Sequence, residues 1–204
     1  MKEIGVPGGR GIRVMHTSLD EVKATQVAAF FLRSAQGQHI AKYRKLVRLM
    51  YLSDREALVR LGNKITHGKH CSLPDGPVIS EVNDLLSNSD YAYKYQEQGY
   101  WSKHIICTRN HGVELLDDPG TGRLAASHIA ILEYIVNEYG ELSDEDLGAI
   151  THSLPEYDRP EGKRRASTIP PAKTLMNGAF TAEQAKGIAC ENEAYDFFRR
   201  LVKQ

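Results

Sequence analysis

The feature that most constrains this chain is a long run with helical spacing between His39 and Leu61. Apolar side chains recur there every three or four residues: Ile40, Tyr43, Leu46, Val47, Met50, Leu58 and Leu61. Because an α-helix completes a turn every 3.6 residues, this spacing collects them on one face and predicts a helix that buries that face. Gly62 follows directly and can adopt the left-handed conformation that ends a helix. A helix this long needs neighbours that cover its apolar face, so a mainly helical fold is expected.

Other segments show the same spacing. Residues 20–35 and 124–139 each present one apolar face, and Gly140 ends the second of these segments. A further helix is predicted to begin near Pro77, because the first position of a helix tolerates the fixed φ and the missing N–H of proline. These segments supply the neighbours that the helix ending at Leu61 requires.

Two capping boxes mark the starts of further helices. Ser143 followed by Asp146 predicts a short helix that runs to about His152. Thr181 followed by Gln184 predicts the start of a last helix in the same way. The apolar residues of that last helix are expected to be buried: Ile188, Tyr195, Phe198 and Leu201.

Residues 91–116 favour β-structure instead. A β-forming run at 105–108, a turn signal at 110–112 and returning apolar residues at 113–116 predict a hairpin. The predicted fold class is therefore mainly α (α+β), a compact single-domain helical bundle with a small β-hairpin. Residues 1–18 are glycine-rich and predict a flexible N-terminal arm before a domain over residues 19–204. Residues 153–180 contain four prolines and predict a long irregular connection.

The charge balance limits the partners. Lys and Arg together number 26, as do Asp and Glu, which gives a formal net charge of +0 at pH 7. Non-specific nucleic-acid binding depends on a surplus of basic residues, so nucleic acid is not expected as a partner. No apolar run approaches the roughly 18 residues of a membrane span, and the N-terminus lacks the apolar stretch of a signal peptide. Three widely separated cysteines fit reduced thiols, so a cytoplasmic protein without a membrane partner is predicted.

Two groups of potential metal ligands were weighed: His67, His70 and Cys71, and His104, Cys107 and His111. Histidine nitrogen and cysteine sulfur are zinc donors, so a metal-dependent hydrolase is one alternative function. Neither group has zinc-finger spacing, and alternation along a strand would point His104 and Cys107 to opposite faces. The sequence also lacks a G-x-S-x-G motif and a local cysteine-nucleophile signature. We therefore predict no metal site, no cofactor and no catalytic residue.

Aromatic and basic residues are the candidates for a partner-binding surface. Tyrosine and tryptophan supply rigid amphipathic area and dominate interaction hot spots. The alternative is that one side of the tyrosine row covers the core. A basic cluster in the long connection could contact phosphate or an acidic protein surface. The candidate partner-binding residues are Tyr91, Tyr93, Tyr95, Tyr100, Trp101, Lys163, Arg164 and Arg165.

The order of short motifs along the chain resembles a known family. Residues 45–86 contain Lys-Leu, Tyr-Leu-Ser-Asp-Arg, Gly-Asn-Lys-Ile-Thr and Gly-Pro-Val in turn. This succession resembles the opening of the SocA-like Panacea domain found in bacterial and phage antitoxins. Residues 131–157 are similar to its second half, with Tyr-Gly, Leu-Ser and Thr-His-x-x-Pro-Glu in order. The resemblance is strongest over residues 25–160. Two departures are the His-Gly-Lys-His run at 67–70 and a tyrosine at 157, where the family usually has an aromatic residue that is often tryptophan.

The resemblance implies an antitoxin that binds a cognate toxin protein directly and neutralises it without catalysis. Some members of the family also deliver their toxin to an ATP-dependent protease, so an adaptor role is a finer possibility. The matching motif residues are expected to act as scaffold: Asp54, Arg55, Thr66, Gly76, Pro77 and His152. A DNA-binding autoregulator, suggested by short helices before a hairpin, is a further alternative, against which the neutral charge argues.

Overall fold

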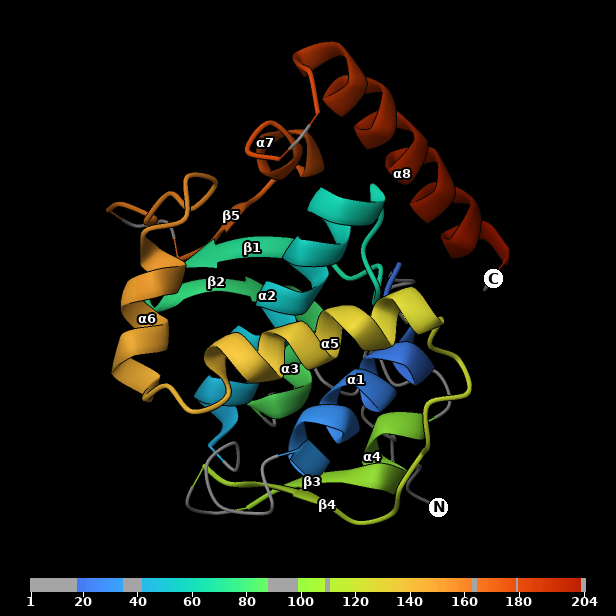
Figure 1. Cartoon of the computed structure of the whole chain (residues 1–204), viewed down its shortest axis with the longest axis vertical. Coiled ribbons are helices and arrows are strands. Elements are labelled where there is room, and N and C mark those ends of the chain that lie inside the picture. Colours follow the sequence, from blue (N-terminus) through green and yellow to red (C-terminus); the bar gives the residue numbers. More distant parts are fainter. Residues whose placement is uncertain are drawn as a thin grey trace, which may run out of the picture.

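The computed structural model describes residues 18–34, 42–87, 99–108, 111–162, 165–178 and 180–202. Helices predominate, which confirms the predicted mainly α (α+β) class (Figure 1). The helices are α1 (Glu21–Ser34), α2 (Tyr43–Leu61), α3 (Ser80–Leu86), α4 (Tyr100–His104), α5 (Ala126–Tyr139), α6 (Asp144–His152), α7 (Pro171–Leu175) and α8 (Ala182–Val202). The strands are β1 (His70–Leu73), β2 (Gly76–Ile79), β3 (Ile105–Cys107), β4 (Val113–Leu115) and β5 (Ser167–Thr168).

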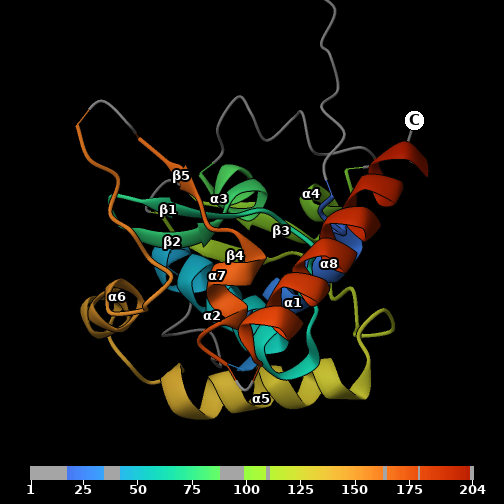
Figure 2. The ribbon, with the colours of Figure 1, turned by 90° about the horizontal axis from the view of Figure 1, so that it is seen from above.

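Helix α2 is the centre of the fold. Helices α1, α3, α5, α6 and α7 and strand β2 all pack against it. Its buried side chains include Leu46, Leu49 and Met50, which belong to the main hydrophobic core. The helix ends at Gly62, whose φ of 73° lies in the left-handed region, as the sequence predicted. Figure 2 shows α5 along one side of this core and the strands β1 and β2 on the other.

The strands form two small antiparallel sheets. The predicted hairpin is confirmed as β3 and β4, with Ile105 paired to Leu115 and Cys107 to Val113. A second sheet has the order β2-β1-β5, and the sequence did not predict it. Strand β5 consists of two residues, which is too short to leave a pattern in the sequence. The segment 153–180 therefore contains β5 and α7, and its description as irregular throughout was wrong.

The prediction of a helix start at Pro77 was wrong. Pro77 lies within β2, opposite Ser72 of β1, and α3 begins three residues later at Ser80. Proline is tolerated in an edge strand, where the missing N–H removes no bond from the ladder, and β2 is the edge of its sheet. Proline is favoured at a helix start and is also tolerated in an edge strand. Only the tertiary pairing of β2 with β1 decides between these two positions for Pro77.

Both predicted helix starts are confirmed, the second by a complete capping box and the first by its N-cap hydrogen bond. The backbone N–H of Asp146 donates to Ser143 Oγ at 3.1 Å at the start of α6. At the start of α8, the N–H of Gln184 donates to Thr181 Oγ1 at 3.2 Å, and the N–H of Thr181 donates to Gln184 Oε1 at 2.9 Å. These local hydrogen bonds satisfy N–H groups that the first turn of a helix leaves unpaired.

The predicted buried face of α8 was wrong. Tyr195 is 48% exposed, Phe198 63% and Leu201 45%, whereas Ala185, Ala189 and Asn192 are buried. The N-terminal half of α8 packs its small residues against Leu58 and Leu175, with Ile188 partly buried beside them. The helix therefore turns its small and polar face inward, and its large apolar residues face outward.

No helix in the described ranges is long and apolar enough to cross a membrane. The predicted N-terminal arm falls almost wholly on residues 1–17, which lie outside the described residues. Ser18 is described, and its hydroxyl donates to the carbonyl of His67 at 2.8 Å.

Candidate functional site

Asp54 and Thr66 form the centre of a buried polar network. Both side chains are fully buried. The carboxylate of Asp54 accepts the Thr66 backbone N–H at 2.9 Å and the Thr66 hydroxyl at 2.5 Å. Burial favours a raised pKa for Asp54, but the neighbouring His70 ring and the hydrogen bonds from Thr66 outweigh it and hold the pKa below its usual value. An ionised Asp54 thus fixes the chain just after α2 to the last turns of that helix.

His70 lies against the same carboxylate. Its Nε2 is 3.5 Å from Asp54 Oδ2, which is too long for a strong hydrogen bond. Its ring packs 4.9 Å from the ring of Tyr51, centroid to centroid. Burial lowers the pKa of His70 although Asp54 favours its protonated form. A neutral imidazole therefore fills the space between α2 and β1.

A second part of the network joins α2 to the segment after α6. Glu156 is 1% exposed, and its carboxylate accepts from Arg55 Nε at 2.5 Å and from the Tyr51 hydroxyl at 3.2 Å. Burial and the Glu156 carboxylate both raise the pKa of Tyr51 far above its ordinary value, so Tyr51 remains protonated and donates. The Pro-Glu motif of the second half thereby meets the Asp-Arg motif of the first.

The turn between β1 and β2 meets the end of α6. Gly76 has a φ of 122°, and a side chain there would lie 3.3 Å from His152 Nε2 and 3.4 Å from Thr151 Oγ1. His152 stacks on Tyr157 at a centroid distance of 5.0 Å, and the Tyr157 hydroxyl donates to the Leu73 carbonyl at 2.9 Å. Glycine is therefore required at 76 both by its backbone conformation and by the close approach of α6.

This network is closed rather than open to a substrate. Asp54, Thr66, His70 and Glu156 are all buried, and every carboxylate among them is held by neighbouring donors. Two hollows lined by described residues lie elsewhere, one beside the β1–β2 turn at Asp75 and one beside the β3–β4 hairpin. The arrangement fixes α2, the first sheet and the segment after α6 to one another, and it presents no reacting group to solvent.

The potential metal ligands do not come together. Within the described ranges, no three His, Cys, Asp or Glu side chains are arranged to hold a metal ion. His67 faces α8, whereas His70 faces Asp54. His104 Nδ1 lies 3.1 Å from the Asp117 carbonyl, and Cys107 donates to the Leu86 carbonyl. The sixth residue, His111, packs against Tyr43. The residues of each group are close together in the sequence, but in the structure their side chains contact different neighbours.

The candidate partner-binding residues are only partly described. Tyr91, Tyr93, Tyr95, Lys163 and Arg164 lie outside the described residues. Tyr100 is half-buried beside His104, and Arg165 is exposed. Trp101 is 2% exposed and belongs to the main core. It therefore offers no surface to a partner, and the tyrosines and the basic residues remain as candidates. Its position in the short helix α4, which the alternation of the tyrosines did not predict, turns the indole ring inward.

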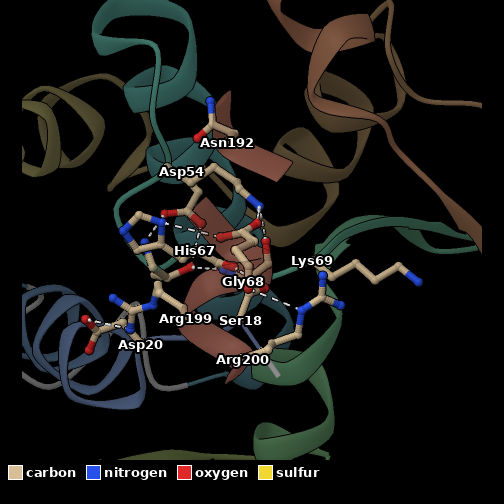
Figure 3. A network of polar contacts seen from close by, with 12 residues as sticks. Ser18, Asp20, Asp54, His67, Gly68, Lys69, Asn192, Arg199 and Arg200 are labelled. Atoms are coloured by element: carbon tan, nitrogen blue, oxygen red, sulfur yellow. Dashed lines mark hydrogen bonds and ion pairs between the residues drawn. The ribbon is translucent and has the colours of Figure 1, made fainter. Parts of the chain in front are cut away.

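Sequence reasoning missed a second polar cluster beneath α8 (Figure 3). Asp196 lies 3.8 Å from Lys64 Nζ and 3.8 Å from His67 Nδ1, and Arg199 reaches Asp20 at 3.2 Å. Burial, reinforced by the charge of Arg199, lowers the pKa of His67 to about 4, so His67 is neutral at neutral pH and makes no ion pair with Asp196. Burial raises the pKa of Asp196. Charged residues at helical spacing near the end of the chain were the available signal.

The fold and the network define a mainly helical protein whose motif residues hold its elements together. The chain matches a family model described as antitoxin SocA-like, Panacea domain, over residues 46–157. The match covers more than half of the chain, and it contains nearly all of α2, both halves of the buried network and the β3–β4 hairpin. The chain belongs to the SocA-like Panacea domain family. Comparisons with curated proteins and with solved structures found no significant match.

Proposed function

We propose that this protein is an antitoxin that neutralises a cognate toxin by direct protein–protein binding and that it acts without catalysis. Its membership of the antitoxin SocA-like Panacea family carries the proposal. The closed network supports it, because Asp54, His70 and Glu156 are buried among their own partners. In this proposal the network supplies a rigid scaffold, and toxin recognition belongs to the surface.

Two surface regions are proposed to contact the toxin. One follows the tyrosines before α4 and includes Tyr91, Tyr93, Tyr95 and Tyr100. The other is the basic segment before β5, with Lys163, Arg164 and Arg165. Helix α4 and the connection from α6 to β5 lie on different sides of the molecule in Figures 1 and 2. The two regions are therefore to be tested by separate sets of substitutions.

Capture of the tagged chain from its native host, followed by growth assays, tests this function. We expect one stoichiometric partner that stops growth when expressed alone and is harmless when this chain is expressed with it. A partner that is not toxic, or a toxin that this chain fails to neutralise, contradicts the proposal. For the surfaces, Tyr93→Ala with Tyr95→Ala is compared with Lys163→Ala, Arg164→Ala and Arg165→Ala. The matched control is Leu61→Ala, which changes an exposed apolar residue at the end of α2.

The adaptor role is a finer version of the same proposal. If the chain delivers its toxin to an ATP-dependent protease, the half-life of the toxin falls when the antitoxin is present and recovers when ATP is depleted. If the chain acts by inhibition alone, the toxin is at least as long-lived in the complex as it is free. Pulse-chase measurement of the toxin separates these two mechanisms, and both are compatible with neutralisation by direct binding.

A further inference from the structure

In the C-terminal half of helix α8, polar residues face the body of the protein and large apolar residues face outward. The side chains that face the body there are Asn192, Asp196 and Arg199. The outward side carries Phe197, which is 52% exposed, Phe198 at 63%, Leu201 at 45% and Val202 at 87%. Figures 1 and 2 show α8 along the periphery of the molecule. A peripheral helix normally turns its apolar face to the core, so this arrangement points to a partner on the outer side.

The outward residues follow the spacing of a helix–helix seam. Gly187, Cys190, Ala194, Phe197 and Leu201 are separated by three, four, three and four residues, and all are exposed. Apolar residues in this alternation form the contact line of two packed helices. Gly187 faces open space, with no atom within 4 Å of where its side chain would be.

The side chains along the seam increase in size from its N-terminal part to its C-terminal part. Its N-terminal part contains the small residues Gly187, Cys190 and Ala194, and its C-terminal part contains Phe197 and Leu201. Two copies of α8 packed antiparallel place the small part of each against the large part of the other. In the register that opposes Ala194 to Phe197, Cys190 is also opposed to Leu201. Each layer then combines one small and one large side chain, as dense packing requires. A parallel pair would set phenylalanine against phenylalanine and glycine against glycine.

The charges beside the seam agree with the antiparallel direction. The exposed acidic residues Glu191 and Glu193 lie beside its small part, and the exposed Arg200 lies beside its large part. The antiparallel register brings Glu193 of one copy near Arg200 of the other, twice, across the two-fold axis. In a parallel pair, Glu193 and Arg200 of the two copies would lie seven residues, or about 10 Å, apart along the axis, so this pairing would be lost.

We propose that the outer face of α8 is a homodimer interface, in which two copies of this chain pack their α8 helices antiparallel. The inference is independent of the proposed toxin binding, since it rests on the size gradient, the charges and the exposed apolar residues of α8 itself. The dimer leaves α4 and the segment before β5 outside the interface, so one assembly presents two sets of candidate toxin-binding surfaces.

Light scattering with size-exclusion chromatography tests the oligomeric state. The wild-type chain is expected to run at twice the 22.8 kDa of one chain. Phe197→Lys combined with Leu201→Lys should give a monomer with an unchanged circular dichroism spectrum. Leu116→Lys, an equivalent change at an exposed apolar residue of another surface, should remain a dimer. A wild-type chain that stays monomeric up to about 0.1 mM overturns the proposal, as does a dimer that survives the double substitution.

Disulfide trapping tests the direction and the register. After mild oxidation, Leu201→Cys should form a covalent dimer through Cys190 of the other copy, because the two positions face each other only in the antiparallel register. The wild type should not cross-link, since its two Cys190 residues are then far apart. Leu201→Cys combined with Cys190→Ser is the control and should not cross-link either. Covalent dimers of the wild type, or of this control, would show a parallel pair and would overturn the proposed arrangement.

Charge reversal adds a readout that does not depend on apolar contacts. Glu193→Arg and Arg200→Glu should each weaken the dimer several-fold, whereas the two changes together should restore it. If both single variants weaken the dimer and the double variant weakens it further, the proposed pairing of Glu193 with Arg200 is wrong. Neutralisation of a toxin plays no part in these measurements, so their failure and a failure of the antitoxin function are distinguishable.

Discussion

Helices α2 and α8 are the two longest helices described, and they differ in where their large apolar residues lie. Helix α2 lies at the centre, with apolar residues buried on several sides, and its polar residues Asp54 and Arg55 are satisfied in a closed network. Helix α8 lies at the periphery, packs polar residues against the body and exposes its aromatic rings. The matched family region 46–157 contains α2 except for its first three residues, and it contains none of α8. The comparison shows that the region matched by the family model forms a scaffold with a closed polar network. Helix α8, outside that region, adds an exposed apolar surface.

The largest effect is expected from Asp54→Ala. The substitution leaves the buried N–H and hydroxyl of Thr66 without an acceptor, and loss of hydrogen bonds to a buried charge costs about 3–5 kcal/mol of unfolding free energy. Urea denaturation measures this loss. The control is Asp118→Ala, which removes an exposed carboxylate paired with Arg33 and should cost about 0–1 kcal/mol. Equal losses in the two variants would show that the network does not hold α2 in the way proposed.

A somewhat smaller effect is expected at Glu156. Glu156→Leu leaves the guanidinium of Arg55 without its buried partner and should destabilise the fold by about 3 kcal/mol. Arg55→Met combined with Glu156→Leu removes both charges and should recover more than half of that loss, because no unpaired buried charge remains. The free energies of the wild type, the two single variants and the double variant give the coupling. A double variant with the summed loss of the two singles would mean that the residues do not act as a pair.

A pH dependence is expected from beneath α8. The pKa of His67 is lowered from 6.5 to about 4 in the folded protein, so the unfolded chain binds one more proton between these values. Stability contributed by His67 is therefore complete above pH 6.5 and is lost as the pH falls toward 4, by about 1–3 kcal/mol. His67 has a φ of 58°, which asparagine tolerates, so His67→Asn is the suitable comparison.

The urea midpoints of the wild type and His67→Asn are compared at pH 7 and at pH 5. Since burial also lowers the pKa of His70, both proteins should lose stability on acidification, and the wild type should lose more. Identical losses would show that the His67 ring does not titrate in this window.

The smallest effect is expected on the outer face of α8. Phe198→Ser, measured at a protein concentration where the chain is monomeric, should change the free energy of unfolding by no more than about 0.5 kcal/mol, because the ring is 63% exposed. Phe31→Ala, at a fully buried phenylalanine of α1, should cost about 3–5 kcal/mol. If Phe198→Ser instead destabilises the monomer strongly, the outer face of α8 is not open in solution and the contrast with α2 does not hold.

Local sequence signals predicted the helical elements well. The spacing up to Leu61, the glycine at 62 and the two capping boxes concern residues within a few positions of one another, so a single helical turn contains the information. The β3–β4 hairpin was predicted for the same reason, since its turn and its two strands are adjacent in sequence. The order of the family motifs was also visible, and it covers the residues that later meet in the buried network.

Contacts between distant segments, and the choice of which face of an element is buried, depended on the tertiary structure. Strand β5 exists only because residues 167–168 pair with β1, and Pro77 is a strand residue only because β2 is an edge. Glu156 meets Arg55 across a long stretch of chain, and no local pattern marks that contact. In α8 the helical spacing shows that two faces exist, but periodicity carries no information on which face the body covers. The small residues of α8 pack against Leu58, and Asp196 and Arg199 reach Lys64 and Asp20. These contacts decide which face is covered, and they leave the aromatic face exposed.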